Sequence, residues 1–165
     1  MKSSRCGTVQ MGATYAEANG VRQRAVCYVT RGRNELLVFE EAGVPQGTLV
    51  QLPAGGLDPG ETPAQAAARE AFEETGLSGL GEPVHLGSCI WGRDGWTGPE
   101  QVWHYFQLSA PLATPDAWTH TVTGGELDTG MHFRLRFTPL SHPDLTPGHG
   151  SHEYLPELIS LQEPQ

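Results

Sequence analysis

The fold is decided by residues 55–77, which read GGLDPGETPAQAAAREAFEETGL. Thr62 is suited to cap the N-terminus of a helix, a proline follows at the first helical position, and Gln65 completes a capping box three residues after the cap. No helix breaker follows until Gly76, a residue typical of the left-handed end of a helix. We therefore predict a helix over Ala64–Thr75, entered from a glycine-rich loop.

Three carboxylates share one face of this predicted helix. Glu70, Glu73 and Glu74 are three and four residues apart, so they repel one another at a cost of a few tenths of a kcal/mol per pair unless something compensates. A solvated acidic face is one interpretation. A metal site is the other, since carboxylate oxygens are hard ligands suited to Mg²⁺ or Mn²⁺. The residues expected to hold the opposite side of the helix against a sheet are Ala66, Ala67, Ala68, Ala71 and Phe72.

The same stretch resembles the signature of the Nudix hydrolases, a MutT-like family. It has Gly55, five residues, Glu61, seven residues, and then REAFEETGL over residues 69–77, so every polar and glycine position of that signature is filled. Ala71 stands where a larger aliphatic residue is usual. Because we expect Ala71 to face the sheet, we expect an effect on packing and none on catalysis.

The resemblance implies an α/β fold, a Nudix-like α/β/α sandwich with a mixed β-sheet and a catalytic loop–helix–loop. It extends in outline over about residues 20–162. The implied activity is hydrolysis by water of a diphosphate bond in a nucleoside diphosphate derivative or related small organic pyrophosphate. Mg²⁺ is the implied cofactor, with Mn²⁺ as a substitute, and the implied partner is the small-molecule substrate, with a homodimer left open.

Residue by residue, the resemblance makes Glu70, Glu73 and Glu74 the metal-binding carboxylates, one of which also activates the attacking water. Arg69 would orient these glutamates, and Glu61 would support the loop through Arg69. The residues that shape the box are Gly55, Glu61 and Gly76, and a backbone carbonyl of Ala54 or Gly55 is a further metal ligand.

A further acidic ligand often comes from a loop before a late strand in this family. Glu126 and Asp128 lie in the corresponding region, between glycines, and Glu100 is a weaker candidate. A solvated turn is the alternative interpretation for the first two residues.

Aromatic residues after the box are the candidates for contact with substrate. Trp91 and Trp96 could stack on a base or sugar, or they could pack a loop. His104 alternates along a strand with Trp103, so the two residues face opposite sides. We weigh a substrate-binding or acid–base role for His104 against a structural role, and we favour the structural one. No substrate subfamily is selected.

The remaining apolar runs predict a mixed α/β domain in which strands and helices do not alternate regularly. Residues 1–12 are expected to be a flexible N-terminal segment and residues 13–165 a single domain. The Asn19-Gly20 pair predicts a hairpin over residues 13–31. Further strands are predicted at 36–39, 49–54, 84–91, 101–108, about 118–122 and 131–140, and a closing helix at 151–161.

Composition limits the partners. The chain has 165 residues and a formal net charge of −9, and it has no basic block, which disfavours binding to nucleic acid through phosphate attraction. An acidic protein that binds phosphate needs a metal cation, locally placed arginines or backbone N–H donors. Because we find no signal peptide and no membrane-length apolar run, we expect a cytoplasmic protein without membrane contact. Cys27 and Cys89 lie in apolar runs and are expected in the core.

Mg²⁺-dependent hydrolysis of a diphosphate is therefore our functional prediction. The alternative is a non-catalytic module of the same fold that senses a nucleotide or metabolite. Loss of glutamates from the box would favour that alternative, and this box keeps all of them.

Overall fold

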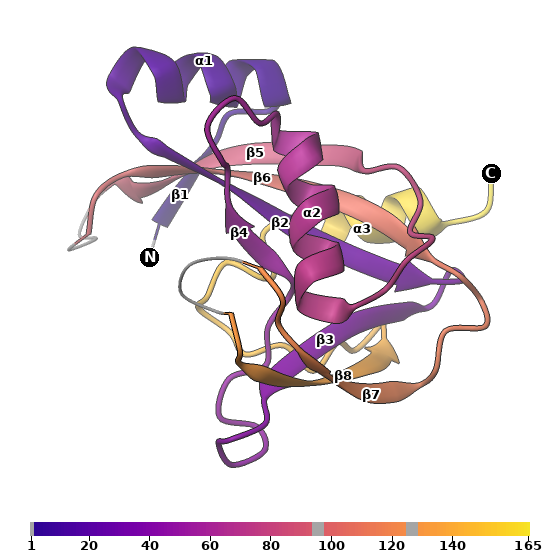
Figure 1. Ribbon diagram of the computed structural model, residues 1–165. Coiled ribbons are helices and arrows are strands. Elements are labelled where there is room, and N and C mark those ends of the chain that lie inside the picture. The colour runs from indigo at the N-terminus through magenta and orange to yellow at the C-terminus, as the bar shows by residue number, and fades with distance from the viewer. Residues whose placement is uncertain (1, 94–97, 125–128) are drawn as a thin grey trace.

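The central sheet is mixed and mostly antiparallel in the computed structural model, which describes residues 2–93, 98–124 and 129–165. Its strand order is β1-β5-β6-β2-β3-β8-β7, and β4 pairs with β2 (Figure 1). β2 and β6 are parallel, and β4 and β3 are antiparallel to β2. The bounds are β1 Lys2–Arg5, β2 Arg22–Arg31, β3 Glu35–Glu41, β4 Ala54–Gly56, β5 Val84–Arg93, β6 Gln101–Ala110, β7 Ala117–Thr121 and β8 His132–Pro139.

Helices cover both faces of this sheet. α1 (Val9–Asn19) and α2 (Pro63–Thr75) lie on one face, and α3 (Leu155–Gln162) lies on the other (Figure 1). One core joins α2 to alternate residues of β2 and β3, and a second core joins α3 to the intervening residues. The predicted α/β/α sandwich with a mixed sheet is thereby confirmed.

Helix α2 begins and ends as predicted. Thr62 accepts a hydrogen bond from the Gln65 backbone N–H at 3.2 Å, and the Gln65 side chain accepts one from the Thr62 N–H at 2.9 Å. Gly76 ends the helix in the left-handed region, with φ of 73°. The face against the sheet differs in part from the prediction, because Ala68 and Phe72 are exposed. The alanines that do contact the sheet are Ala66, Ala67 and Ala71.

The N-terminal hairpin predicted over residues 13–31 is wrong, because its first half belongs to α1. The Thr8 side chain caps this helix by accepting from the Met11 N–H at 3.1 Å. Gly20 ends it in the left-handed region, with φ of 61°. An Asn-Gly pair suits a hairpin turn and a helix end equally, since both use a left-handed glycine.

Residues 1–12 were expected to be flexible, but residues 2–5 form β1, which pairs with β5, and residue 9 begins α1. The expected boundary at residue 13 therefore falls inside a helix.

The other predicted strands are confirmed, with one exception. Residues 49–54 form only an isolated bridge at Gln51 and the start of β4. The closing helix begins at Leu155 instead of residue 151.

Cys27 and Cys89 are fully buried, as predicted. Among the described residues no helix has the length and apolar character needed to cross a membrane.

We predict that Gly87→Ala destabilises the protein by about 1–3 kcal/mol, because a side chain there overpacks the core. An added Cβ would lie 2.0 Å from a ring carbon of Tyr154, whose hydroxyl donates to the Ser88 carbonyl at 2.7 Å. Gly43→Ala is the control, since its Cβ would meet no atom within 4 Å. Urea unfolding measures both variants, and equal stability of the two would contradict the close approach of Tyr154.

Candidate active site

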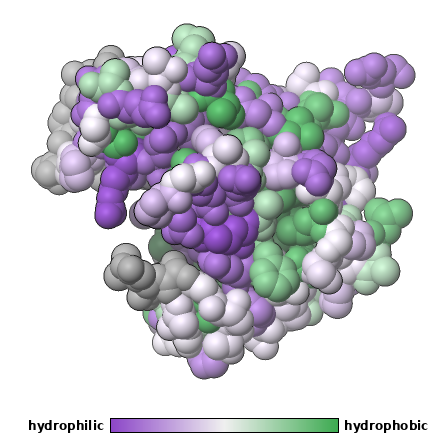
Figure 2. Space-filling model, turned by 45° about the horizontal axis from the view of Figure 1, so that its top comes forward, coloured by the Kyte–Doolittle hydropathy of each residue, from purple (hydrophilic) through white to green (hydrophobic). Residues whose placement is uncertain are grey.

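A polar cleft of about 980 Å³ lies between α2, the loop after β4 and the beginning of β2. Figure 2 shows a broad hydrophilic area across the middle of this face of the molecule. The cleft is lined by Glu17, Arg22, Gln23, Arg24, Gln101, residues 54–61, Arg69, Glu70 and Glu73. The glycine-rich loop and most of the charged residues of the box therefore line the same cleft.

Arg69 is the centre of the charged network. Its Nε and Nη2 donate to the two carboxylate oxygens of Glu61, each at 2.8 Å. Its Nη1 donates to Glu70 at 2.7 Å and to Glu73 at 3.2 Å, and Nη2 also donates to the Gly56 carbonyl at 2.9 Å. The bond to Glu61 is the largest cause of a raised Arg69 pKa, and the same bond lowers the pKa of Glu61. These are the contacts expected of a residue that orients the glutamates.

Two glycines allow the carboxylates to approach the backbone. A Cβ on Gly55 would lie 2.1 Å from the Glu70 carboxylate, and a Cβ on Gly124 would lie 2.1 Å from that of Glu73. Glu70 is buried, and desolvation raises its pKa against the opposing effect of Arg69. A further cation near this buried carboxylate would stabilise its charged form.

Glu74 lies apart from the other two carboxylates. It is only 3% exposed, and its Oε2 accepts a hydrogen bond from the Ala54 N–H at 3.0 Å. Glu74 therefore braces β4 against α2, whereas Glu70 and Glu73 line the cleft. Within the described residues, no three His, Cys, Asp or Glu side chains stand close enough to hold a metal ion. Arg69 and the Ala54 N–H occupy oxygens that such an ion would use.

The chemistry of the oxygen donors at the cleft suits a divalent cation, although the spacing of the described residues in this structure does not form a metal site. Carboxylate oxygens of Glu70 and Glu73 and the backbone of Gly55 meet at the cleft, and oxygen ligands of this kind suit Mg²⁺ or Mn²⁺.

Of the other predicted site residues that the structure describes, Trp91, Glu100 and His104 do not line the cleft. Trp91 is 5% exposed and packs against Trp103 at a ring distance of 5.1 Å, in the core on the α3 side. Of the two interpretations, stacking on substrate and packing, the structure favours packing for Trp91. Glu100 accepts a hydrogen bond from the Tyr15 hydroxyl of α1. The candidates Trp96, Glu126 and Asp128 lie outside the described residues.

His104 is fully buried and faces α1, opposite Trp103 as predicted. Its Nδ1 is 2.6 Å from Ser88 Oγ and its Nε2 is 2.8 Å from Gln23 Oε1. Burial lowers the pKa of His104 to about 4. These observations favour the structural role, because no His104 atom is open to a ligand.

Arg22 and Arg24, at the start of β2, were not predicted as site residues. Both line the cleft, and neither forms an ion pair with any described residue. Arg24 lies over the Trp103 ring, 5.5 Å from its centre. Two arginines that are two residues apart in a strand lie on the same face. This spacing could have identified them, since an acidic protein that binds phosphate without enough other cations needs locally placed arginines.

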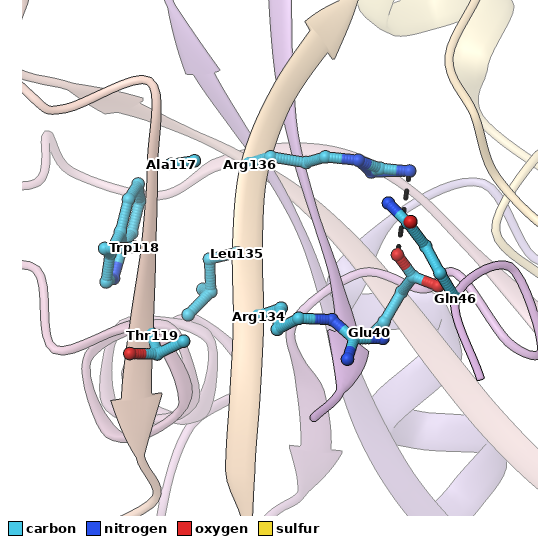
Figure 3. Close-up of a pocket in the computed structure, with 8 residues that line it drawn as sticks. All are labelled: Glu40, Gln46, Ala117, Trp118, Thr119, Arg134, Leu135 and Arg136. Atoms are coloured by element: carbon cyan, nitrogen blue, oxygen red, sulfur yellow. Dashed lines mark ion pairs between the residues drawn. The ribbon is translucent and has the colours of Figure 1, made fainter. Parts of the chain in front are cut away.

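Another cavity, of about 460 Å³, lies beside β7 and β8 (Figure 3). Arg136 pairs there with Glu40 at 3.8 Å, and Arg134 donates to the carbonyls of Ala42 and Val44. Because its charged groups are already partnered and Glu40 is the sole carboxylate among its described lining, it lacks the carboxylate cluster of the cleft.

The family model described as NUDIX domain matches residues 20–155. This chain belongs to the Nudix family. The expectation of a Nudix-type pyrophosphohydrolase is confirmed by this match together with the relatives described next.

Relatives of this Nudix chain carry related names. It is 32% identical over 126 residues to an RNA pyrophosphohydrolase of Erythrobacter litoralis, covering 67% of this chain and 76% of that protein. It is 37% identical over 65 residues to the diphosphoinositol polyphosphate phosphohydrolase 3-beta of Bos taurus, covering 38% of each.

Solved structures share the Nudix fold at low identity. A NUDIX hydrolase from Nitrosomonas europaea has a TM-score of 0.59 at 23% identity, over 87% of this chain and 91% of that one. A C. elegans Ap4A hydrolase complex has a TM-score of 0.53 at 18% identity, over 86% and 93%.

We predict that Gly55→Ala in this Nudix protein lowers the free energy of unfolding by about 1–3 kcal/mol, since the methyl group displaces the Glu70 carboxylate. Hydrolytic activity should fall at least about tenfold, because small misplacements of catalytic groups are costly. Gly56→Ala is the matched control, since its Cβ would have no closer contact than 3.8 Å. A Gly55→Ala variant as stable and active as Gly56→Ala would show that Glu70 is free to move.

Proposed function

We propose that this Nudix enzyme hydrolyses a diphosphate bond in a nucleoside diphosphate derivative or related small organic pyrophosphate, with Mg²⁺ as cofactor. One observation carries the proposal. The cleft is lined both by Glu70 and Glu73 and by Arg22 and Arg24, and these two arginines form no ion pair with a described residue. Carboxylates suit a cation and arginines suit phosphate oxygens, so a metal diphosphate complements both pairs of residues.

Glu70 and Glu73 would hold the metal, with Gly55 as a backbone ligand and Glu74 behind them. When bound there, Mg²⁺ would neutralise the diphosphate, polarise the phosphorus centre and lower the pKa of a bound water. One of the glutamates would accept the proton of the attacking water.

The chain's own residues would then bind and orient the substrate. Arg69 holds Glu70 and Glu73 in place through hydrogen bonds of fixed geometry. Arg22 and Arg24 would bind phosphate oxygens away from the reacting centre. With a metal at the glutamates and arginines at the phosphate oxygens, a chain of net charge −9 could bind an anionic substrate.

A phosphate-release screen with Mg²⁺ and Mn²⁺ tests the substrate class. The panel contains nucleoside triphosphates, ADP-ribose, sugar nucleotides, dinucleoside polyphosphates and coenzyme A. The names of the relatives add a 5′-triphosphorylated RNA and a diphosphoinositol polyphosphate. We expect turnover of a nucleoside-containing small molecule and weak activity on RNA, because the acidic chain repels a polyanion.

A sensing module without turnover is the second candidate. The complete box and the cleft favour catalysis over this alternative. Tight binding of a nucleotide with Mg²⁺ and no phosphate release from any compound in the panel would favour sensing instead.

Activity should vanish in EDTA and return on addition of Mg²⁺ or Mn²⁺, because arginines are the only cationic side chains among the described lining of the cleft and a bound metal would supply the remaining stabilisation of a diphosphate. The measurement is phosphate release before and after metal is restored. Turnover that persists in chelator, with tightly bound metal excluded by elemental analysis, would contradict this mechanism.

Replacing Glu73 by Gln should reduce kcat by a factor on the order of 10² or more, since it removes a ligand charge from the metal site. Glu82→Gln is the control, because Glu82 is exposed and outside the cleft. Circular dichroism checks that both variants fold. A loss of less than threefold at Glu73 would place the metal elsewhere.

A further inference from the structure

A chain of buried and partly buried hydrogen bonds runs beneath α1 and ends at the cleft. His85 Nε2 is 2.9 Å from Ser88 Oγ, Ser88 Oγ is 2.6 Å from His104 Nδ1, and His104 Nε2 is 2.8 Å from Gln23 Oε1. Ser88 and His104 have no exposed surface, whereas Gln23 lines the cleft. The chemistry proposed above for the box uses none of these residues.

The hydrogen-bond capacity of His104 fixes the direction of this chain. A neutral imidazole has one donor and one acceptor nitrogen, and burial keeps His104 neutral at pH 7. Because its Nε2–H donates to Gln23 Oε1, its Nδ1 accepts from the Ser88 hydroxyl, and Ser88 Oγ accepts from His85. The amide oxygen of Gln23 is therefore engaged, and the NH₂ group of this cleft-lining residue remains as a donor.

Helix α1 holds these residues tightly. A Cβ on Gly12 would lie 2.9 Å from His104 Cε1 and 3.0 Å from the Cβ of Ser88. The helix backbone thus closes over the imidazole, so water does not compete for its two nitrogens. A buried polar group whose partners are all satisfied has a single stable orientation.

The register of β2 places Gln23 relative to the carboxylates. Ala25 pairs with Gly55, whose backbone lies against Glu70, and Gln23 is on the same face of β2 two residues earlier. Two residues along a strand span roughly 7 Å, since each residue advances about 3.3 Å. Gln23 therefore lies along the cleft from Glu70, at a position that the organic group of a diphosphate held at Glu70 would reach.

We propose that Gln23 is a specificity-determining residue that donates hydrogen bonds from its amide to an acceptor on the nucleoside part of the substrate, and that Ser88 and His104 are positioning residues that fix the orientation of this amide. This inference rests on the proposed function, because it assumes a nucleoside attached to the diphosphate.

The first test measures binding, so it does not require turnover. Isothermal titration with Mg²⁺ compares ADP, GDP, CDP and UDP with inorganic pyrophosphate. For the nucleotide that binds the native protein best, Gln23→Leu should weaken binding about tenfold, as expected for loss of one hydrogen bond, and leave pyrophosphate unchanged. Gln46→Leu is the control, since Gln46 is exposed and lies at the other cavity.

The second test separates positioning from stability. Ser88→Ala should raise the dissociation constant of that nucleotide about threefold in the native background and have no effect in the Gln23→Leu background, because its influence passes through Gln23. If a substrate is found in the screen, both variants should raise KM and change kcat by less than threefold.

Three outcomes would overturn the inference. These are unchanged nucleotide binding by Gln23→Leu, an equal loss of pyrophosphate binding, or an effect of Ser88→Ala that is additive with Gln23→Leu. Failure of all four nucleotides to bind the native protein while pyrophosphate binds would also overturn it. Nucleotide binding without turnover would instead reject the proposed hydrolysis and leave the role of Gln23 supported.

Discussion

The site depends on one guanidinium group. Arg69 satisfies oxygens of Glu61, Glu70 and Glu73 and also binds the Gly56 carbonyl, so it joins the loop before α2 to the acidic face of that helix. Without it, the carboxylates would repel one another. A lysine has a single charged centre and cannot provide this planar set of donors. The arrangement therefore requires arginine, and it places negative charge at the cleft that only a further cation can balance.

Pairing between strands that are distant in sequence forms the side of the cleft that contains the beginning of β2. β2 pairs in parallel with β6 and antiparallel with β4, so three segments distant in sequence meet at the beginning of β2. Its alternate residues face opposite sides of the sheet, which lets Gln23 lie on the side of α2 while Arg24 reaches Trp103. The cleft thus combines a local element, α2 with its loop, and a surface that exists only in the folded sheet.

The difference between local and long-range signals explains what could be predicted. α2 and its carboxylates could be predicted because Thr62 and Gly76 mark its ends within one short stretch. The first helix was missed because Gly20 suits a helix end and a hairpin turn equally. The orientation of Glu74 depends on the Ala54 N–H, and hence on where β4 pairs. The contact of Gln23 with His104 joins strands 81 residues apart, and no local pattern indicates it.

The close approach of Gly12 to His104 couples the identity of a residue in α1 to that of a residue in β6. α1 precedes residues 20–155, the part of the chain that matches the family, yet it encloses an imidazole within that part. A glycine inside a helix lowers stability by roughly 0.5–1 kcal/mol relative to alanine. We therefore expect glycine at position 12 only where the helix packs against the His104 ring. A small residue in the leading helix and a histidine in β6 should therefore be inherited together, and homologues that lack the helix should carry an apolar residue in place of the histidine.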